Sequence, residues 1–349
     1  MSFSFKGKLY FRFMKFLRKL LLPFSWIYGS VLALRNLFYD LGWFESKSYN
    51  KPIICVGNLS TGGTGKSPMI EFLIDFLKEE YQVAVLSRGY KRKSKGFKEV
   101  FVNSTVEEVG DEPLQFKKKF PNVTVSVCAN RQEGIEKLKT KADVILLDDA
   151  FQHRKVKAST NILLTTFSDL FYKDFVLPAG NLRESKAGAR RADVIVVTKC
   201  PEKVSYARLQ EIQFEMKLKP HQKIYFSKIG YDKNIMGISE SLPLEYLLEK
   251  EFTLVTGIAN PKPLINFLKE ENFNFEHKKY PDHHDFTTSE IDDLKGKEII
   301  LTTEKDFVRL QPKLEKFAIY YLPIKTIILK EQERFFKDYI AEEIEKFNH

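Results

Sequence analysis

The chain has 349 residues, 43% of them hydrophobic, so it is long enough to bury the cores of two α/β domains. Its net charge is +10, and Cys55, Cys128 and Cys200 stand far apart, without the spacing of a metal site or a disulfide framework. The composition therefore excludes a disulfide-stabilised secreted scaffold and favours a reducing compartment.

The N-terminal part of the chain is both basic and apolar. Residues 1–50 carry eight Lys or Arg and two Asp or Glu. Residues 20–34 are uncharged, but Pro23 interrupts them and they are shorter than the ~20 apolar residues of a spanning helix. We expect residues 1–45 to form a helical segment on an anionic membrane surface; the alternative is a helix packed on the protein's own core. So many aliphatic residues argue against a nucleic-acid-binding arm, and we expect no nucleic acid partner.

A glycine-rich loop follows between two apolar segments. Residues 52–56 predict a buried strand, and residues 66–80 have the apolar stripe of a helix. The loop between them matches the phosphate-binding pattern G-x-x-x-x-G-K-[ST], with a serine at the first glycine. Its residues are Ser60, Thr61, Gly62, Gly63, Thr64, Gly65, Lys66 and Ser67. Lys66 is expected to reach the β- and γ-phosphates and Ser67 to ligate Mg²⁺. The alternative is a glycine-rich turn with a solvated lysine.

The rest of the chain alternates between predicted strands and helices, which indicates a doubly wound α/β fold. We predict a P-loop NTPase-like, mostly parallel sheet over residues 46–225 and a smaller α/β domain over residues 226–349. The expected strands are 83–87, 123–127, 142–149, 161–167, 192–199, 223–229, 252–258, 298–303 and 317–322.

The apolar run at 144–147 is followed by two aspartates, Asp148 and Asp149. A carboxylate at the carboxyl end of a strand beside a phosphate loop is expected to hold Mg²⁺, directly or through water. The alternative is a pair of solvated acids at a strand end.

Thr198 and Lys199 resemble a guanine-reading motif, but Pro201 stands where that motif has its aspartate, which argues against guanine.

An ordered series of motifs resembles the tetraacyldisaccharide 4′-kinases of lipid A biosynthesis. The motifs are VGNLSTGGTGKSP, LSRGYKR, VGDEP, NRQEG, LDDAFQH, LPAGNLRES, VTK, GIANP, YPDHHDF and TTEKD. Together they cover most of the chain. Ala150 stands where the family is expected to have glycine.

The resemblance implies transfer of the γ-phosphoryl group of ATP, with Mg²⁺, to the 4′-hydroxyl of an acylated glucosamine disaccharide 1-phosphate, which gives lipid IV-A. It also implies a place at the cytoplasmic face of the inner membrane of a Gram-negative bacterium, without an obligate protein partner. The alternative function is a membrane-attached P-loop ATPase that switches a partner protein and phosphorylates no small acceptor.

The resemblance further implies a catalytic base, Asp111, and a histidine that orients it, His283. Because Asp111 precedes Pro113 by two residues, we expect it in an extended or turn segment. Spacing alone does not separate His283 from His284. Four further residues are expected to contact the substrate or phosphates, with surface salt bridges as the alternative: Arg88, Arg131, Arg183 and Glu184. The roles of Lys305 and Asp306 stay open.

Overall fold

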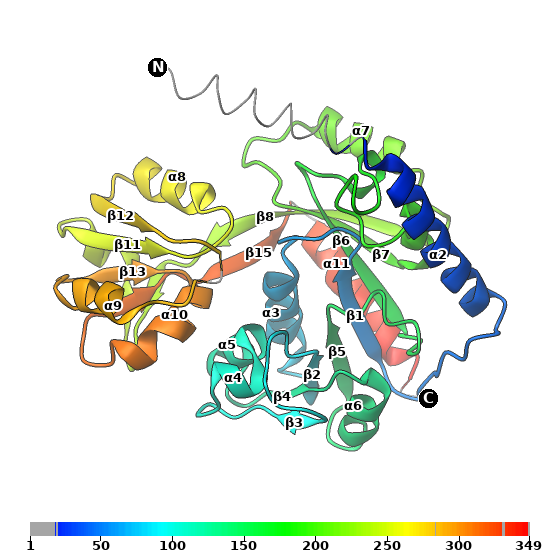
Figure 1. Cartoon of the computed structure of the whole chain (residues 1–349), viewed down its shortest axis with the longest axis horizontal. Helices are drawn as coiled ribbons and strands as arrows, with labels where there is room; N and C mark the ends of the chain where they lie inside the picture. The colour runs from blue at the N-terminus through cyan, green and yellow to red at the C-terminus, as the bar shows by residue number, and fades with distance from the viewer. Residues whose placement is uncertain (1–17, 19, 283, 330–331, 348–349) are drawn as a thin grey trace.

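The computed structural model of this chain describes residues 18, 20–282, 284–329 and 332–347. These residues form two lobes, each built on its own sheet (Figure 1). Both sheets are mostly parallel with helices on their faces, which confirms the predicted α/β class.

The larger lobe contains a nine-stranded sheet in the order β15-β8-β7-β6-β1-β5-β2-β4-β3. Its central strand, β1, pairs in parallel with both β5 and β6. The central strands are apolar at nearly every position because helices cover both faces. The strands are β1 (Ile53–Asn58), β2 (Val83–Ser87), β3 (Lys98–Glu99), β4 (Thr124–Val127), β5 (Val144–Asp148), β6 (Thr160–Thr166), β7 (Val194–Thr198), β8 (Lys223–Tyr231) and β15 (Ile324–Ile328).

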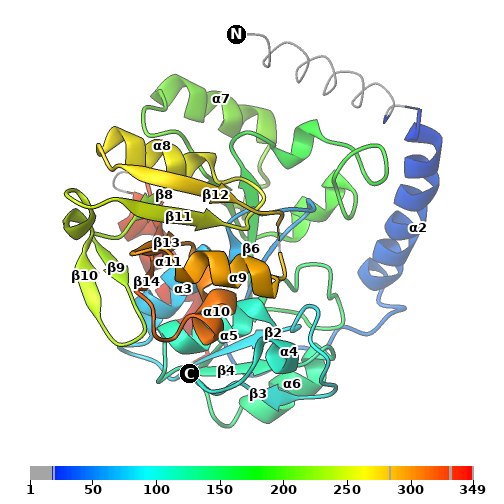
Figure 2. The same cartoon turned by 60° about the vertical axis from the view of Figure 1, so that its left-hand side comes forward.

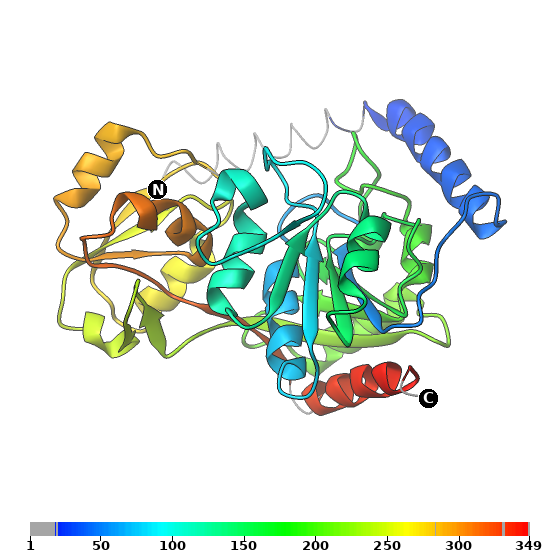
Figure 3. The same cartoon turned by 90° about the horizontal axis from the view of Figure 1, so that it is seen from below.

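Two hydrophobic cores lie on opposite faces of this sheet. One contains side chains of α3 (Lys66–Leu77), α5 (Asp111–Lys119) and α11 (Gln332–Glu345), and α11 is the red helix at the lower edge of Figure 3. The other contains side chains of α6 (Arg131–Leu138) and α7 (Tyr206–Met216). The lobe also contains the short helices α4 (Val106–Val109), η1 (Phe171–Lys173) and η2 (Lys186–Arg191).

The smaller lobe contains a six-stranded sheet in the order β10-β9-β14-β13-β11-β12, seen from the front in Figure 2. Its strands are β9 (Asn234–Met236), β10 (Ser241–Pro243), β11 (Phe252–Thr256), β12 (Phe275–Lys279), β13 (Ile300–Thr302) and β14 (Ile319–Tyr321). Its helices are η3 (Leu244–Leu247), α8 (Lys262–Glu270), α9 (Thr288–Lys295), α10 (Glu304–Leu310) and η4 (Gln311–Lys313).

Two strands join the lobes. β8 leads out of the larger lobe and β15 returns to it, paired antiparallel so that Tyr231 lies opposite Ile324. After β15, α11 packs back onto the larger lobe, where the ring of Phe336 contacts the rings of Phe72 and Tyr225. Sheet membership therefore places β15, and with it α11, in the larger lobe, although both lie within the predicted unit 226–349. The difference arises because pairing of β15 with β8 is non-local.

Helix α2 (Leu22–Asp40) lies along the flank of the larger lobe, away from the smaller lobe (Figures 1 and 3). Ser25 is its one buried residue. Exposed apolar side chains in and beside this helix are Leu20, Leu21, Phe24, Trp26, Ile27, Tyr28, Val31, Leu34, Leu37, Leu41, Trp43 and Phe44. This outward-facing apolar surface disagrees with the alternative of a core helix. Within the described residues, α2 included, no helix has the length and apolar character needed to cross a bilayer.

Candidate active site

The glycine-rich loop connects the end of β1 to the start of α3. Gly62 and Gly65 have φ values of +111° and +90°, a backbone region in which glycine is strongly preferred. Gly65 is the N-cap of α3 and makes no side-chain capping hydrogen bond, so the first N–H groups of the helix are available to an anion. Asn58, the last residue of β1, donates through Nδ2 to Thr64 Oγ1 of the loop over 2.8 Å. This geometry is compatible with a phosphate-binding turn, and phosphate binding by the loop stays a prediction.

Neighbouring segments support this loop from two sides. The Thr61 N–H donates to the Asn181 carbonyl over 2.7 Å, and the Arg183 N–H donates to the Leu59 carbonyl over 2.6 Å. Lys199, directly after β7, donates from Nζ to the Gly63 carbonyl over 2.5 Å. In the sequence, Lys199 belongs to the VTK motif and to an incomplete guanine-reading pattern, and neither predicted a specific contact for it. The structure gives it contact with the phosphate loop.

The two adjacent aspartates have different environments. Asp148 is 1% exposed; its Oδ2 accepts a hydrogen bond from Ser87 over 2.9 Å, and its Oδ1 has no hydrogen-bond partner among the described residues. Burial raises the pKa of Asp148 to about 7, and the carboxylates of Glu112 and Asp149 add to the shift. Asp148 therefore presents a buried carboxylate oxygen that a cation would stabilise.

Asp149 lies in the left-handed region, with φ of +48°, which costs a non-glycine residue roughly 1–2 kcal/mol. Arg183 Nη1 lies 3.0 Å from both of its carboxylate oxygens, and Lys66 Nζ lies 3.7 Å from Oδ1. The predicted loop lysine, strand-end acid and arginine are thus in one cluster, where Asp149 holds two cations next to the phosphate loop.

Glu112 is a site residue that the sequence analysis missed. Its Oε1 accepts from Ser67 Oγ over 2.8 Å and from Lys305 Nζ over 2.9 Å. Burial by itself raises the pKa of Glu112, but the charge and hydrogen bond of Lys305, with the charge of Lys66, lower it to about 2. Glu112 therefore stays ionised and joins the loop serine to the smaller lobe. Its position in the VGDEP motif was the available signal.

Asp111 is the first residue of α5, and Gly110 before it has φ of +91°. The expected extended or turn segment is therefore a helix start, which tolerates Pro113 in its first turn. Arg309 of α10 donates through Nη2 to Asp111 Oδ2. His283 lies outside the described residues, so its predicted pairing with Asp111 stays a prediction.

His284 and Asp306, both in the smaller lobe, have partners there. His284 Nε2 lies 2.9 Å from Glu290 Oε2, and its ring stacks on Tyr280. Asp306 is fully buried and accepts from the Gly257 N–H over 2.8 Å. These contacts indicate structural roles for both residues.

The remaining predicted contact residues differ in exposure. Arg88, after β2, is exposed, whereas Arg131 is 2% and Glu184 is 3% exposed. Arg131 donates to the carbonyl groups of Cys128 and Asp148 over 2.5 and 3.1 Å. Substrate contact stays a prediction for Arg88 and Arg183, while this geometry indicates that Arg131 and Glu184 position other groups.

The residues present fit a magnesium ion bound together with a nucleotide. Mg²⁺ usually takes one or two protein ligands, with phosphate oxygens and water completing its shell. Asp148 Oδ1 is a buried oxygen without a partner among the described residues, and Ser67 lies in the first turn of α3, directly after the glycine-rich loop. Within the described ranges, no group of three or more His, Cys, Asp or Glu side chains forms a metal site by itself.

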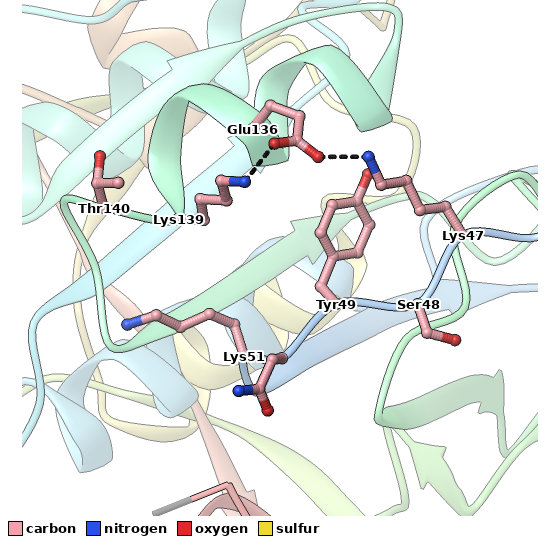
Figure 4. A pocket seen from close by; sticks show the side chains of 8 residues that line it. Lys47, Ser48, Tyr49, Lys51, Glu136, Lys139 and Thr140 are labelled. Carbon is pink, nitrogen blue, oxygen red and sulfur yellow. Dashed lines mark hydrogen bonds and ion pairs between the residues drawn. The ribbon is translucent and has the colours of Figure 1, made fainter.

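A cavity of about 440 Å³ lies elsewhere, next to the start of β1 (Figure 4). Its lining includes Lys47, Lys139 and Glu136, and the Glu136 carboxylate accepts from both lysines at 2.6 Å. The phosphate loop is at the opposite, carboxyl end of β1, so this cavity is separate from the candidate active site.

Comparison with known proteins places these observations in one family. Residues 17–345 match the family model described as Tetraacyldisaccharide-1-P 4'-kinase. A tetraacyldisaccharide 4'-kinase of Flavobacterium johnsoniae is 47% identical over 341 residues, covering 95% of this chain and 100% of that protein. One of Bacteroides thetaiotaomicron is 43% identical, covering 93% of this chain and 92% of that protein.

A solved structure agrees in fold. The crystal structure of the "apo" form of LpxK from Aquifex aeolicus in complex with ATP is similar to this chain with a TM-score of 0.77 and 34% identity, covering 94% of this chain and 99% of that chain. The family match spans the phosphate loop, the strand-end acids and the smaller lobe alike. The chain therefore belongs to the tetraacyldisaccharide-1-P 4'-kinase family.

Proposed function

We propose that this protein transfers the γ-phosphoryl group of ATP to the 4′-hydroxyl of an acylated glucosamine disaccharide 1-phosphate and so forms lipid IV-A. The observation that carries the proposal is the cluster of Lys66, Asp148 and Asp149 at the phosphate loop, in a chain that matches this kinase family over residues 17–345. The alternative, an ATPase that switches a partner protein, has no comparable support from the site.

The phosphate loop binds the nucleotide in this proposal. The N–H groups at the start of α3 bind phosphate oxygens, and Lys66 neutralises charge that develops on the transferred group. Asp148 Oδ1 and Ser67 Oγ would hold Mg²⁺, which would neutralise negative charge on the β- and γ-phosphates. Asp149 pairs with Arg183 and Lys66, so it orients these cations, and it would contact Mg²⁺ directly or through water.

Asp111 is the base in this proposal. It accepts the proton of the acceptor hydroxyl as the oxygen attacks phosphorus, and His283 orients it. Arg309 donates to the same carboxylate from the smaller lobe, and Lys305 of that lobe donates to Glu112. Two ion pairs thus connect the lobes beside the transferred group, which favours a site completed by both lobes.

The acceptor is a lipid, and α2 is the element suited to reach it. The apolar residues in and beside α2 are exposed, Trp26 at 69% and Ile27 at 66%. Burying such a surface in the interface of a bilayer contributes about 25 cal/mol per Å² of apolar area. We infer that the protein acts at the cytoplasmic face of the inner membrane, where ATP and the lipid are both present. In this proposal Arg88 and Arg183 contact the anionic headgroup or the phosphates.

The test is incubation of the purified full chain with labelled ATP and an acylated disaccharide 1-phosphate, followed by chromatography of the lipid. Label should appear at the 4′-position with wild-type protein and disappear with Lys66→Ala, whose thermal unfolding should be unchanged. Release of free phosphate without lipid labelling would favour the switch ATPase.

A second comparison tests the membrane placement. The double substitution Trp26→Ser, Ile27→Ser should weaken binding to anionic vesicles and reduce transfer to a long-chain acceptor in vesicles more than transfer to a short-chain acceptor in solution. Equal losses with both acceptors would contradict the role proposed for α2.

A further inference from the structure

The contacts between α2 and the larger lobe are polar. Ser25 Oγ accepts from the Ala179 N–H over 2.8 Å, and Asn36 Nδ2 donates to Glu184 Oε2 over 3.0 Å. Arg35 donates to the Gln152 carbonyl over 3.1 Å. Most large apolar side chains of α2 are exposed, so these polar contacts make up an important part of its attachment to the protein. The attachment of α2 therefore depends in large part on a small number of hydrogen bonds. Each adds only modest net stability, because its donor and acceptor give up hydrogen bonds to water when they pair.

Glu184 is the buried acceptor at the centre of these contacts. It is 3% exposed, and three side chains donate to its carboxylate. Arg191 Nη2 lies 2.8 Å and Gln152 Nε2 lies 3.1 Å from Oε1, while Asn36 of α2 donates to Oε2. A buried carboxylate is stable only when such donors remain in place. The position of Glu184 is therefore sensitive to whether α2 is attached.

Glu184 is connected to the phosphate loop by two routes. Gln152 Nε2, which donates to Glu184, also donates to the Asn58 carbonyl over 2.7 Å, at the end of β1. The chain just before Glu184 lies against the loop, where Ser60 pairs with Leu182 in an antiparallel bridge. In the same segment, the Asn181 carbonyl accepts from the Thr61 N–H, and the Arg183 N–H donates to the Leu59 carbonyl. A shift of Glu184 would therefore reach the loop by two routes, through the Gln152 side chain and through the backbone of the preceding residues.

We propose that Glu184 is a positioning residue that couples attachment of α2 to the geometry of the phosphate loop, so that the protein binds ATP more tightly on a membrane than in solution. A bilayer that takes up the outward apolar surface fixes α2 and selects the state in which Asn36 contacts Glu184. The coupling rests on the proposed function, because it requires α2 to lie on a membrane.

The test measures affinity for a non-hydrolysable ATP analogue with and without anionic phospholipid vesicles that contain no acceptor lipid. The full chain should bind the analogue about fivefold more tightly or better with vesicles, and by linkage the analogue should tighten vesicle binding by the same factor. Asn36→Ala should bind vesicles like wild type and lose most of this tightening. We substitute Asn36 and not Glu184, because Asn36→Ala removes a single donor to Glu184. Substitution of Glu184 itself would leave the Arg191 guanidinium without its partner carboxylate.

A matched control separates this route from general loosening of α2. Asp40→Ala removes another contact of α2, the ion pair between Asp40 and Arg154 at 2.6 Å, in which the Asp40 side chain is 61% exposed. Exposed pairs contribute little, so this variant should keep the tightening. The coupling is refuted if wild-type affinity for the analogue is equal with and without vesicles, or if Asn36→Ala retains the full effect.

The two proposals fail in different ways. Absence of vesicle binding by wild-type protein would overturn both the coupling and the membrane placement. Normal vesicle binding and normal lipid phosphorylation, without any change in affinity for the analogue, would overturn the coupling alone. A loss of tightening in Asp40→Ala as large as in Asn36→Ala would assign the effect to α2 as a whole and refute the specific role of Glu184.

Discussion

Replacement of Asp111 by asparagine should remove the base and keep the fold. The amide oxygen of asparagine can still accept from Arg309 but cannot take a proton. Alanine is less informative, because the Asp111 and Arg309 side chains are only 17% and 12% exposed. Removing one partner of this part-buried ion pair would destabilise the fold, which would obscure the catalytic effect.

The expected loss with Asp111→Asn is about 10²–10⁴-fold in turnover, the usual contribution of a general base, equal to about 2.7–5.5 kcal/mol of transition-state stabilisation. The base acts on the acceptor hydroxyl and not on bound nucleotide, so the KM for ATP should change by less than about threefold. The assay is a steady-state series over ATP and acceptor lipid. The matched control is Glu107→Gln, an acid in the preceding helix whose side chain is 69% exposed.

A double-mutant cycle extends the test to His283. His283→Ala should reduce turnover less than Asp111→Asn does. The double variant should have nearly the same turnover as Asp111→Asn, because a residue that only orients the base has no effect once the base is absent. Turnover of Asp111→Asn within about tenfold of wild type, or effects of the two substitutions that simply multiply, would refute a coupled base at Asp111.

Three other outcomes are expected. ATP should be a much better donor than GTP, because Pro201 replaces the guanine-reading aspartate; equal use in competition assays would contradict this. Asp148→Asn should give a defect that excess Mg²⁺ partly restores in a magnesium titration, and a defect independent of Mg²⁺ would argue against a metal ligand. Glu304 shares Lys119 with the buried Glu71, and burial raises the pKa of Glu304 to about 8 from an ordinary 4.5. The folded protein then binds a proton that the unfolded chain releases, so stability should fall from about pH 5 to pH 8. Glu304→Gln should flatten this slope in thermal unfolding, and an unchanged slope would refute the assignment.

Local patterns predicted the buried parts of the fold well and the exposed parts poorly. The run at 83–87 is an apolar strand covered on both faces, and β2 has those same bounds. β12, with the sequence FEHKK, was not predicted because no residue of this edge strand is buried and its charges hide the strand pattern. β15 was missed for a related reason, since its pairing with β8 joins residues about a hundred positions apart.

The candidate site shows the same division. Lys66, Asp148 and Asp149 follow from motifs in which loop, strand and helix are consecutive. Glu112 and Arg309 could not be selected that way, because their importance depends on contacts across the two lobes, Glu112 with Lys305 and Arg309 with Asp111. The motif that contains Glu184 was noticed, but its burial beneath α2 was not visible in the sequence.

The ribbon formed by β8 and β15 has a consequence for how the protein is made. Tyr231 and Ile324 face each other across this ribbon, so the smaller lobe is an insertion that leaves and re-enters the larger lobe at one point. During synthesis the whole insertion is made before β15 and α11. Until β15 and α11 emerge from the ribosome, the edge of β8 that pairs with β15 is unpaired. The face around Phe72, which α11 covers in the folded protein, is exposed over the same period. Truncation near the C-terminus is expected to leave the inserted lobe intact and the nucleotide-binding lobe open to aggregation.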